Sequence, residues 1–441
     1  MLVSCACWWP RCTGLDQLST VGGDVLTLTG TKFGSLCGFN TLTVGTQPLA
    51  MFLCNETVIQ ASIPAGAGVL GRVALSVGVI PAIIGDGAAG VFSYAAPRIV
   101  ALNGDSALPT LGMFTDSATP RPSVITLEGS NFGPAGYPLV VTFVSPLDGV
   151  VRPATNCTRD PVGHAWVSCY GVVGVGWLHR WAVSVAGQAS PLSAQTTSFL
   201  PPQLVGVLGP GGHNANTDGG QVVRITGSEF GPAGAINDHL ITVVYGPPAD
   251  PARYLAEGCT VSAAGVAGSS LTCITVPGTG GNLFWTVTIA NQTAATPAGP
   301  TAYGWPVIAS FEGPAASAGV TEGHETVMIF GSNFGPEGTP VQAVYTATEG
   351  VRSIVVDATG SSGAVDAALA PAQFVASACE VVDAHRQINC TTAPGAGANI
   401  AWRLTIDGLT SQSPVTSYRC VSAVVGVCCA CGFRAPPRAC G

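Results

Sequence analysis

One seven-residue pattern recurs four times along the chain and limits what it can fold into. The copies are Leu28-Thr-Gly-Thr-Lys-Phe-Gly34, Leu127-Glu-Gly-Ser-Asn-Phe-Gly133, Ile225-Thr-Gly-Ser-Glu-Phe-Gly231 and Ile329-Phe-Gly-Ser-Asn-Phe-Gly335. Their phenylalanines, Phe33, Phe132, Phe230 and Phe334, are separated by 99, 98 and 104 residues. A pattern that repeats at a domain-sized interval predicts a tandem array of similar modules of about a hundred residues each.

A second landmark follows the first and predicts what kind of module this is. In the third copy the turn Val276-Pro-Gly278 precedes the alternating segment Trp285-x-Val287-x-Ile289, and the first and fourth copies have a similar arrangement. The second copy keeps Trp181-x-Val183-x-Val185 but has Val173 in place of the proline. Alternation with period two is typical of a half-buried strand. Since 58 Gly and 33 Pro divide the chain into short pieces, we expect an all-β fold.

The glycines and phenylalanines of the recurring pattern have a structural interpretation. The first glycine of each copy (Gly30, Gly129, Gly227 or Gly331) is expected to adopt positive φ, or to allow a close backbone approach that a Cβ would prevent. The phenylalanine is expected to turn back and close one end of a sandwich, and the last glycine (Gly34, Gly133, Gly231 or Gly335) to end the strand. The alternative is a phosphate-binding loop, but no Lys-Ser/Thr pair follows these glycines.

The third copy resembles the signature of the IPT/TIG domain, an immunoglobulin-like sandwich found in plexins, related receptors, fibrocystin-like proteins and some transcription factors. The signature, Gly-Gly-x-x-Val-x-Ile-x-Gly-x-x-Phe-Gly, runs from Gly219 to Gly231 and reappears from Gly22 to Gly34. The second and fourth copies keep only its Phe-Gly end. The resemblance covers residues 14–419 and implies tandem immunoglobulin-like β-sandwich modules in an elongated array.

The repeat predicts module boundaries at residues 13–95, 96–200, 201–304 and 305–419. The first module is expected to have a missing or atypical opening strand, because Cys5-Ala-Cys7-Trp-Trp9 stands where that strand belongs. Residues 420–441 are expected to begin a fifth module, since Val421-Ser-Ala-Val-Val-Gly-Val427 resembles an opening strand before the chain enters a cysteine-rich tail. We therefore expect the chain to be a fragment of a longer array.

Charge and hydropathy exclude two classes of partner. The chain has 16 basic and 24 acidic residues, and Lys32 is its one lysine. Nucleic-acid binding needs a dense Lys/Arg footprint, so neither a nucleic-acid partner nor a transcription factor is expected. The longest apolar stretch, Val73 to Gly85, is too short for a spanning helix of roughly twenty residues. Residues 1–10 lack the basic region and apolar core of a signal peptide.

The cysteines predict an oxidising compartment, because 16 occur and three copies hold a pair at related places. The pairs are Cys157 with Cys169, Cys259 with Cys273, and Cys379 with Cys390; in the first copy Cys54 is expected to pair with Cys37. Zinc binding is the rival interpretation, but the pairs lack the tight Cys-x₂₋₄-Cys spacing of structural zinc sites. Four Asn-x-Ser/Thr sequons, at Asn55, Asn156, Asn291 and Asn389, add modest support for a secreted setting.

We find no pattern that indicates catalysis, a metal or a cofactor. Six histidines are spread over three modules with no common repeat position, whereas a metal site or a catalytic base requires convergence. His213-Asn-Ala-Asn-Thr-Asp-Gly-Gly220 carries oxygen donors, but without the spaced carboxylates of a calcium loop it is interpreted as an ordinary loop. No enzymatic activity is therefore predicted.

The favoured function is a non-enzymatic extracellular or cell-surface binding protein, of the adhesion or receptor-ectodomain kind, that recognises a protein or a glycan through its variable loops. The alternative is a spacer or glycan-binding region of a larger carbohydrate-active enzyme. Solvent-facing tryptophans on one module face would favour that alternative, and Trp166 and Trp177 are the candidates because Trp181, Trp285 and Trp402 are interpreted as core residues. Membrane insertion by the chain itself is not expected, although a missing segment could anchor it.

Overall fold

The computed structural model describes residues 4–6, 17–82, 91–114, 121–234, 238–262, 269–347, 354–356, 362–364, 373–395, 400–411 and 415–416. Over these residues the chain is almost entirely antiparallel β-structure, as the alternating segments predict. It forms tandem immunoglobulin-like β-sandwiches, and the fold-class prediction is thereby confirmed. The chain divides into two compact units: Met1–Pro201 with Glu229–Ala233 and Ile289–Gln292, and Pro202–Ser228 with Gly234–Thr288 and Thr293–Gly441.

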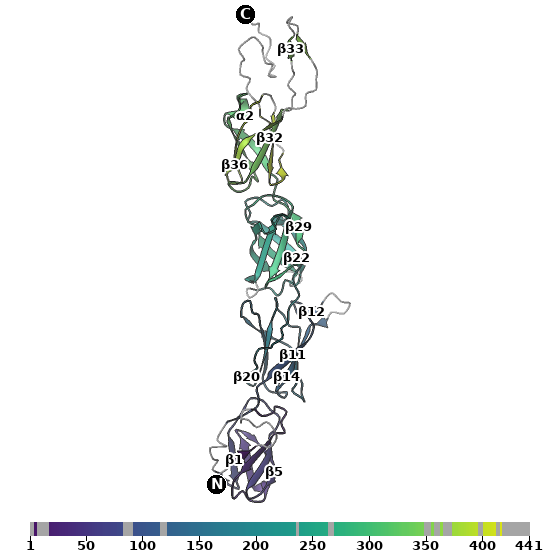
Figure 1. Ribbon diagram of the computed structural model, residues 1–441, viewed down its shortest axis with the longest axis vertical. Coiled ribbons are helices and arrows are strands. Elements are labelled where there is room, and N and C mark those ends of the chain that lie inside the picture. The colour runs from purple at the N-terminus through teal and green to yellow at the C-terminus, as the bar shows by residue number, and fades with distance from the viewer. Residues whose placement is uncertain are drawn as a thin grey trace. The chain divides into compact units, whose positions relative to one another are not determined.

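The first unit contains two sandwiches (Figure 1). The first has the sheets β1(Ser4–Ala6)-β2(Val25–Thr29)-β6(Val58–Ser62)-β5(Ala50–Cys54) and β4(Gln47–Pro48)-β3(Asn40–Val44)-β8(Val73–Val77)-β9(Ile80–Pro81), with the pair β7(Val69–Gly71) and β10(Phe92–Ser93) and the 3₁₀ turn η1(Cys37–Phe39). The second has the sheets β11(Arg98–Gly104)-β14(Val124–Ser130)-β18(Trp166–Tyr170)-β17(Cys157–Arg159) and β16(Val151–Ala154)-β15(Leu139–Val144)-β19(Arg180–Val185)-β20(Gln188–Ala189), with the pair β12(Met113–Phe114) and β13(Arg121–Pro122).

The second unit holds most of the third sandwich and the fourth. The third has the sheets β21(Gln203–Leu208)-β22(Val222–Ser228)-β26(Ser270–Ile274)-β25(Glu257–Val261) and β24(Tyr254–Leu255)-β23(Ile241–Gly246)-β27(Leu283–Ile289)-β28(Gln292–Thr293), with β29(Ala298–Thr301) beside β27 and the turn η3(Pro210–Gly212). The fourth has the sheets β30(Val307–Glu312)-β31(Thr326–Ser332)-β37(Gln387–Thr391)-β36(Ser377–Asp383) and β35(Gln373–Val375)-β32(Val341–Ala347)-β38(Ile400–Ile406)-β39(Leu409–Thr410), with β40(Val415–Thr416), the hairpin β33(Ile354–Val356)-β34(Ser362–Ala364) and the helical turn α2(Ala315–Ala318).

Each core forms where the inward residues of two sheets meet. In the second sandwich Ile125 and Leu127 pack in one cluster with Val141 and Trp181. The three tryptophans interpreted as core residues are buried, at 0%, 0% and 3% exposure for Trp181, Trp285 and Trp402. Because inward residues alternate with outward ones along each strand, burying one face fixes the register of the whole sheet.

The phenylalanine of the recurring pattern is buried in every copy. The rings of Phe33, Phe132, Phe230 and Phe334 are at most 1% exposed. A Cβ on Gly331 would overlap the Val307 carbonyl oxygen and come within 2.5 Å of the Phe334 Cζ atom, so this glycine is required for close approach and not for positive φ. The residue before each phenylalanine, such as Asn131 or Asn333, has left-handed backbone instead, with φ near +60°.

The first sandwich has an opening strand, which the predicted boundary at residue 13 leaves out. Strand β1 pairs with β2 from Ser4↔Thr29 to Ala6↔Thr27, in the place that β11, β21 and β30 take beside their own partners. The strand is three residues long, so it is atypical but present. The fifth module expected at residues 420–441 lies outside the described residues.

Candidate functional site

The outward face of β18 in the second sandwich carries two exposed aromatic side chains. Along this strand Val167 and Cys169 are buried in the core, so the intervening residues point to the other side. Trp166 and Tyr170 are 37% and 38% exposed. They are four positions apart on the strand, which corresponds to about 13 Å at roughly 3.3 Å per residue. Trp166, Ser168 and Tyr170 form the centre of what we call the aromatic face.

A shallow groove of about 670 Å³ runs over the aromatic face. Its lining residues come from three neighbouring strands of one sheet and the residue before β18, and they are Val100, Thr126, Glu128, Gly129, Ala165, Trp166, Ser168 and Tyr170. Val100 is the extra residue of a β-bulge, where the pairing of β11 with β14 shifts between Ile99 and Ala101. The bulge presents Val100 to solvent at the edge of the groove, with 66% exposure.

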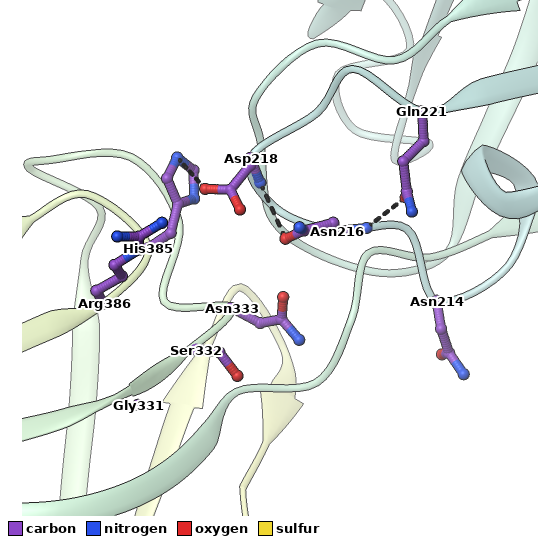
Figure 2. Close-up of a pocket in the computed structure, with 9 residues that line it drawn as sticks. All are labelled: Asn214, Asn216, Asp218, Gln221, Gly331, Ser332, Asn333, His385 and Arg386. Carbon is purple, nitrogen blue, oxygen red and sulfur yellow. Dashed lines mark hydrogen bonds and ion pairs between the residues drawn. The ribbon is translucent and has the colours of Figure 1, made fainter.

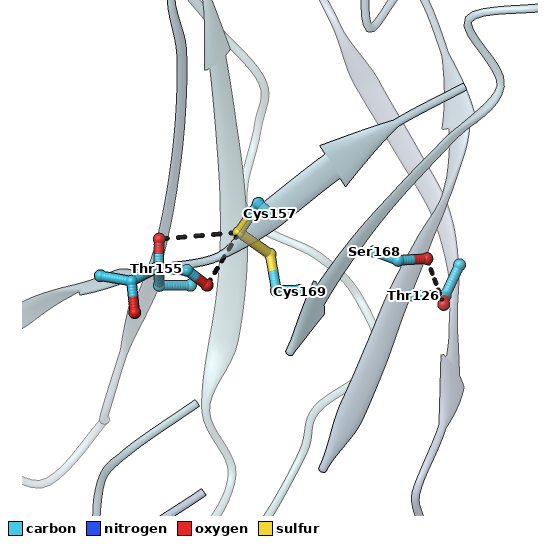
Figure 3. Close-up of a disulfide and its surroundings, with 6 residues drawn as sticks. Thr126, Thr155, Cys157, Ser168 and Cys169 are labelled. Carbon is cyan, nitrogen blue, oxygen red and sulfur yellow. Dashed lines mark hydrogen bonds between the residues drawn. A yellow bond between two sulfur atoms is a disulfide. The ribbon is translucent and has the colours of Figure 1, made fainter. Parts of the chain in front are cut away.

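Hydroxyl groups form the floor of the groove between the two rings. The Thr126 and Ser168 hydroxyls are hydrogen-bonded to each other at 2.8 Å, as Figure 3 shows. Glu128 lies opposite Trp166 in the register of β14 with β18, is exposed, and makes no hydrogen bond or ion pair within the part of the chain that the structure describes. The groove thus offers two ring faces, two hydroxyls and one carboxylate, and its lining includes no basic side chain.

A disulfide holds the strand from its inner side. Cys157 on β17 and Cys169 on β18 are directly opposite in register and bonded, with their Cα atoms 4.0 Å apart (Figure 3). Cys169 is fully buried while its neighbours Ser168 and Tyr170 form part of the groove. The link fixes β17 against β18 and so limits how far the groove residues can shift.

The aromatic face occurs in one of the four sandwiches. Register places three outward residues of the equivalent strand at Val58, Gln60 and Ser62 in the first, Ser270, Thr272 and Ile274 in the third, and Gln387, Asn389 and Thr391 in the fourth. None of these is aromatic. A feature confined to one copy is not needed for the shared fold, which makes this face a candidate for function.

The cysteines predicted to pair are bonded in the structure. Cys37–Cys54, Cys157–Cys169, Cys259–Cys273 and Cys379–Cys390 have Cα separations of 5.3, 4.0, 4.2 and 4.1 Å. The last three are cross-strand links at the same place in their sandwiches. Each joins the edge strand of a sheet to its neighbour, namely β17 to β18, β25 to β26 and β36 to β37. In the first sandwich the register places Ala61 where the other three have their second cysteine, and Cys37 of η1 is bonded to Cys54 of β5 instead.

The predicted glycosylation sites differ in accessibility. Asn55, Asn156 and Asn291 are exposed, each in a turn, and the last two have left-handed backbone. Asn389 is half-buried on β37, and its side-chain oxygen accepts a hydrogen bond from Gln387 Nε2 at 3.0 Å. Occupancy of the four sequons remains a prediction.

Two of the six histidines do share a repeat position, contrary to the sequence prediction. The carbonyls of His164 and His385 accept the backbone N–H of the signature residues Phe132 and Phe334. Their Nδ1 atoms lie 3.1 Å from the Thr20 hydroxyl and 2.9 Å from the Thr217 hydroxyl. The loops between signature and histidine differ in length, so the equivalence was hidden in the sequence. Burial lowers the pKa of His164, which favours its neutral form.

Other residues singled out in the sequence have different surroundings. Trp177 is 42% exposed but lies outside the groove. Among the described residues no cluster of three or more His, Cys, Asp or Glu side chains could hold a metal ion. The loop of His213–Gly220 contributes Asn214, Asn216 and Asp218 to a separate polar pocket of the second unit. Tyr170 escaped the sequence analysis, although the alternation Trp166-x-Ser168-x-Tyr170 was a usable signal.

Comparisons with known proteins find similar chains among solved structures, at low sequence identity. No protein-family profile and no curated protein matches the chain. Among solved structures, the plexin A4 extracellular region is 11% identical over 94% of this chain and 48% of its own length, with a TM-score of 0.19. The surface glycan-binding protein PbSGBP-B of Prevotella bryantii is 10% identical over 89% and 91%, with a TM-score of 0.27. The Down syndrome cell adhesion molecule is 10% identical over 95% and 50%, with a TM-score of 0.19. The chain thus spans about half the length of the plexin structure it matches.

Within the described ranges, no helix is both long and apolar enough to cross a lipid bilayer.

Proposed function

We propose that this protein is an extracellular or cell-surface binding protein without enzymatic activity, and that the aromatic face of the second sandwich recognises a glycan. The observation that carries the proposal is the pair of exposed rings, Trp166 and Tyr170, on one face of β18 with hydroxyls between them. The tandem sandwiches, the four disulfides and the sequons support an oxidising, extracellular setting.

The chemistry of the groove suits a carbohydrate. A sugar ring has one face of C–H bonds that packs on an aromatic ring and a rim of hydroxyls that needs hydrogen-bonding partners, and sites of this kind combine apolar surface with a few polar groups. Trp166 and Tyr170 provide the ring faces, while Thr126, Ser168 and Glu128 provide acceptors and donors. Because the lining includes a carboxylate and no basic side chain, the groove favours a neutral glycan over a phosphorylated or sulfated one.

The recurring signature supports an assignment of the sandwiches to a domain type. We propose that the sandwiches are IPT/TIG domains, on the Gly-x-x-Phe-Gly pattern and its fourfold recurrence, with the boundaries given by the repeat except that the first includes β1. Non-reducing peptide mapping of the secreted protein tests the extracellular setting. Free thiols at Cys259 and Cys273 would contradict it.

Glycan binding is tested by screening the full chain on an array of neutral oligosaccharides and measuring hits by titration calorimetry. We expect Trp166→Ala to weaken binding about tenfold, because a ring contact of this kind contributes roughly 0.5–1.5 kcal/mol beyond its buried area. Tyr170→Ala is expected to have a similar effect. Trp177→Ala is the matched control, since Trp177 is an exposed tryptophan of the same sandwich outside the groove.

Two results would contradict the proposal. One is equal affinity of the Trp166→Ala protein and the Trp177→Ala protein for a glycan that the wild type binds. The other is a pair of observations: the array gives no hit, and a protein ligand is found whose affinity depends on Trp166. That result would make the aromatic face a protein-binding surface.

A further inference from the structure

The second unit contains a polar pocket that is independent of the aromatic face. Its volume is about 470 Å³, within the usual range of roughly 300–1,000 Å³ for small-ligand sites. It is lined from the third sandwich by the loop after η3 and from the fourth by the end of β31 and the turn between β36 and β37 (Figure 2). The lining residues are Asn214, Asn216, Asp218, Gln221, Gly331, Ser332, Asn333, His385 and Arg386, and none has an apolar side chain.

Two side-chain amides of this pocket are oriented by the backbone so that their NH₂ groups remain available. The Gln221 Oε1 atom accepts the Asn216 backbone N–H at 2.6 Å, and the Asn216 Oδ1 atom accepts the Asp218 backbone N–H at 3.3 Å. Both dashed bonds are drawn in Figure 2. Since a backbone N–H can only donate, the amide oxygens are identified by these bonds and are occupied. Gln221 and Asn216 therefore present hydrogen-bond donors to a ligand.

The acidic residue of the pocket has an ion-pair partner, whereas its arginine has none in the described part of the chain. The Asp218 carboxylate lies 3.6 Å from His385 Nε2, and His385 is held on its other side by Thr217. The guanidinium of Arg386 is exposed and has no carboxylate or hydrogen-bond partner in the described part of the chain. The Arg386 guanidinium therefore lies beside two amides whose NH₂ groups are available.

From this arrangement we propose that the pocket binds an anionic sugar residue, through the carboxylate or sulfate that the sugar carries. Arg386 receives the anionic group, because a guanidinium matches the geometry of such oxyanions and makes charge-assisted bonds to them. The NH₂ groups of Asn216 and Gln221 add donors. The Ser332 hydroxyl and the side-chain oxygen of Asn333, whose Nδ2 is taken up by the Trp305 carbonyl at 3.1 Å, remain for the ring hydroxyls. The proposal does not depend on glycan binding by the aromatic face.

Saturation-transfer NMR and calorimetry on the full chain test this with four probes: glucuronic acid, glucose 6-sulfate, glucose and inorganic sulfate. We expect both charged sugars, or one of them, to bind more tightly than glucose, and the comparison of the two identifies the anionic group. Arg386→Gln is expected to weaken that binding tenfold or more, because hydrogen bonds to charged groups contribute roughly one to two factors of ten. Arg403→Gln, an exposed arginine of the same sandwich on β38, is the control and should bind like the wild type.

Gln221→Glu is a second variant, and it is expected to keep the fold. Its carboxylate can still accept the Asn216 backbone N–H, but it replaces the NH₂ donors by an acceptor with negative charge, so binding of the anionic sugar should be lost. Equal affinity for glucose and the charged sugars, unchanged affinity in the Arg386→Gln protein, or binding of inorganic sulfate without either charged sugar would each overturn the proposal. Loss of neutral-glycan binding at the aromatic face would leave these results unaffected.

Discussion

His179 gives the second sandwich a dependence on pH that the third and fourth should lack. It is fully buried, its ring makes edge contacts to Phe143 and Phe199 at centroid distances of 5.4 and 5.2 Å, and neither ring nitrogen has a hydrogen-bond partner. The equivalent positions, two residues before the core tryptophan, hold Leu283 and Ile400. A histidine thus occupies a site that the fold fills elsewhere with an aliphatic side chain.

Burial lowers the pKa of His179 from its ordinary value near 6.5 to about 4. Between pH 6.5 and pH 4 the unfolded chain therefore binds a proton that the folded chain does not. Stability is fully retained above pH 6.5 and is lost progressively as the pH falls toward 4. A shift of this size corresponds to about 3 kcal/mol, since each pKa unit is worth about 1.4 kcal/mol. The second sandwich should accordingly lose about two factors of ten in folding equilibrium constant over this range.

The matched substitution is His179→Leu, which introduces the residue found at the same place in the third sandwich. Hydrogen exchange of strands β15 and β19, measured from pH 7 to pH 4 and corrected for the intrinsic pH dependence of exchange, compares the two proteins. We expect the substitution to remove most of the acid-dependent loss of protection. At pH 7 the substitution should raise the free energy of unfolding by about 1–3 kcal/mol, because it removes two buried nitrogens that have no hydrogen-bond partner. An identical acid-induced loss in both proteins would refute the argument from His179.

Two further predictions concern the cross-strand disulfide and the signature glycine. Replacing both Cys157 and Cys169 by Ala should destabilise the second sandwich by about 3 kcal/mol, since the chain-entropy model gives that value for a closed loop with a sequence separation of 12. Amide hydrogen exchange in β17 and β18 should then accelerate about a hundredfold. An acceleration below about fivefold would contradict the loop-closure account. Gly331→Ala should destabilise the fourth sandwich by about 1–3 kcal/mol, because its Cβ would overlap both the Val307 carbonyl oxygen of the neighbouring strand and the Phe334 ring. An unchanged denaturant midpoint for that sandwich would show that strand β30 and the ring can both move aside.

Much of the fold follows from patterns that the sequence carries openly. Alternation with period two around Trp181, Trp285 and Trp402 identifies inward faces, because side chains on a strand point to alternate sides. Because the signature recurs four times, the β-sandwich predicted for one module is predicted for all four. The opening strand β1 was harder to place, since its residues Ser4–Ala6 have no apolar alternation and are defined by pairing with β2.

The candidate sites depend on contacts between segments that the sequence keeps apart. Trp166 was visible as a candidate, but the groove also needs Glu128 and Val100 from strands that register alone brings beside it. The polar pocket could not be predicted for the same reason, because Arg386 and Gln221 line it together although 165 positions separate them in the sequence.

Periodicity and the spacing within one copy are enough to predict the all-β class, the repeat, the cysteine partners and the core tryptophans. The fold is needed to show which outward residues share a surface, which polar groups keep free donors, and that His164 and His385 occupy equivalent positions. Those properties depend on hydrogen-bond geometry and on which strands are neighbours, and neither is encoded in a local run of residues.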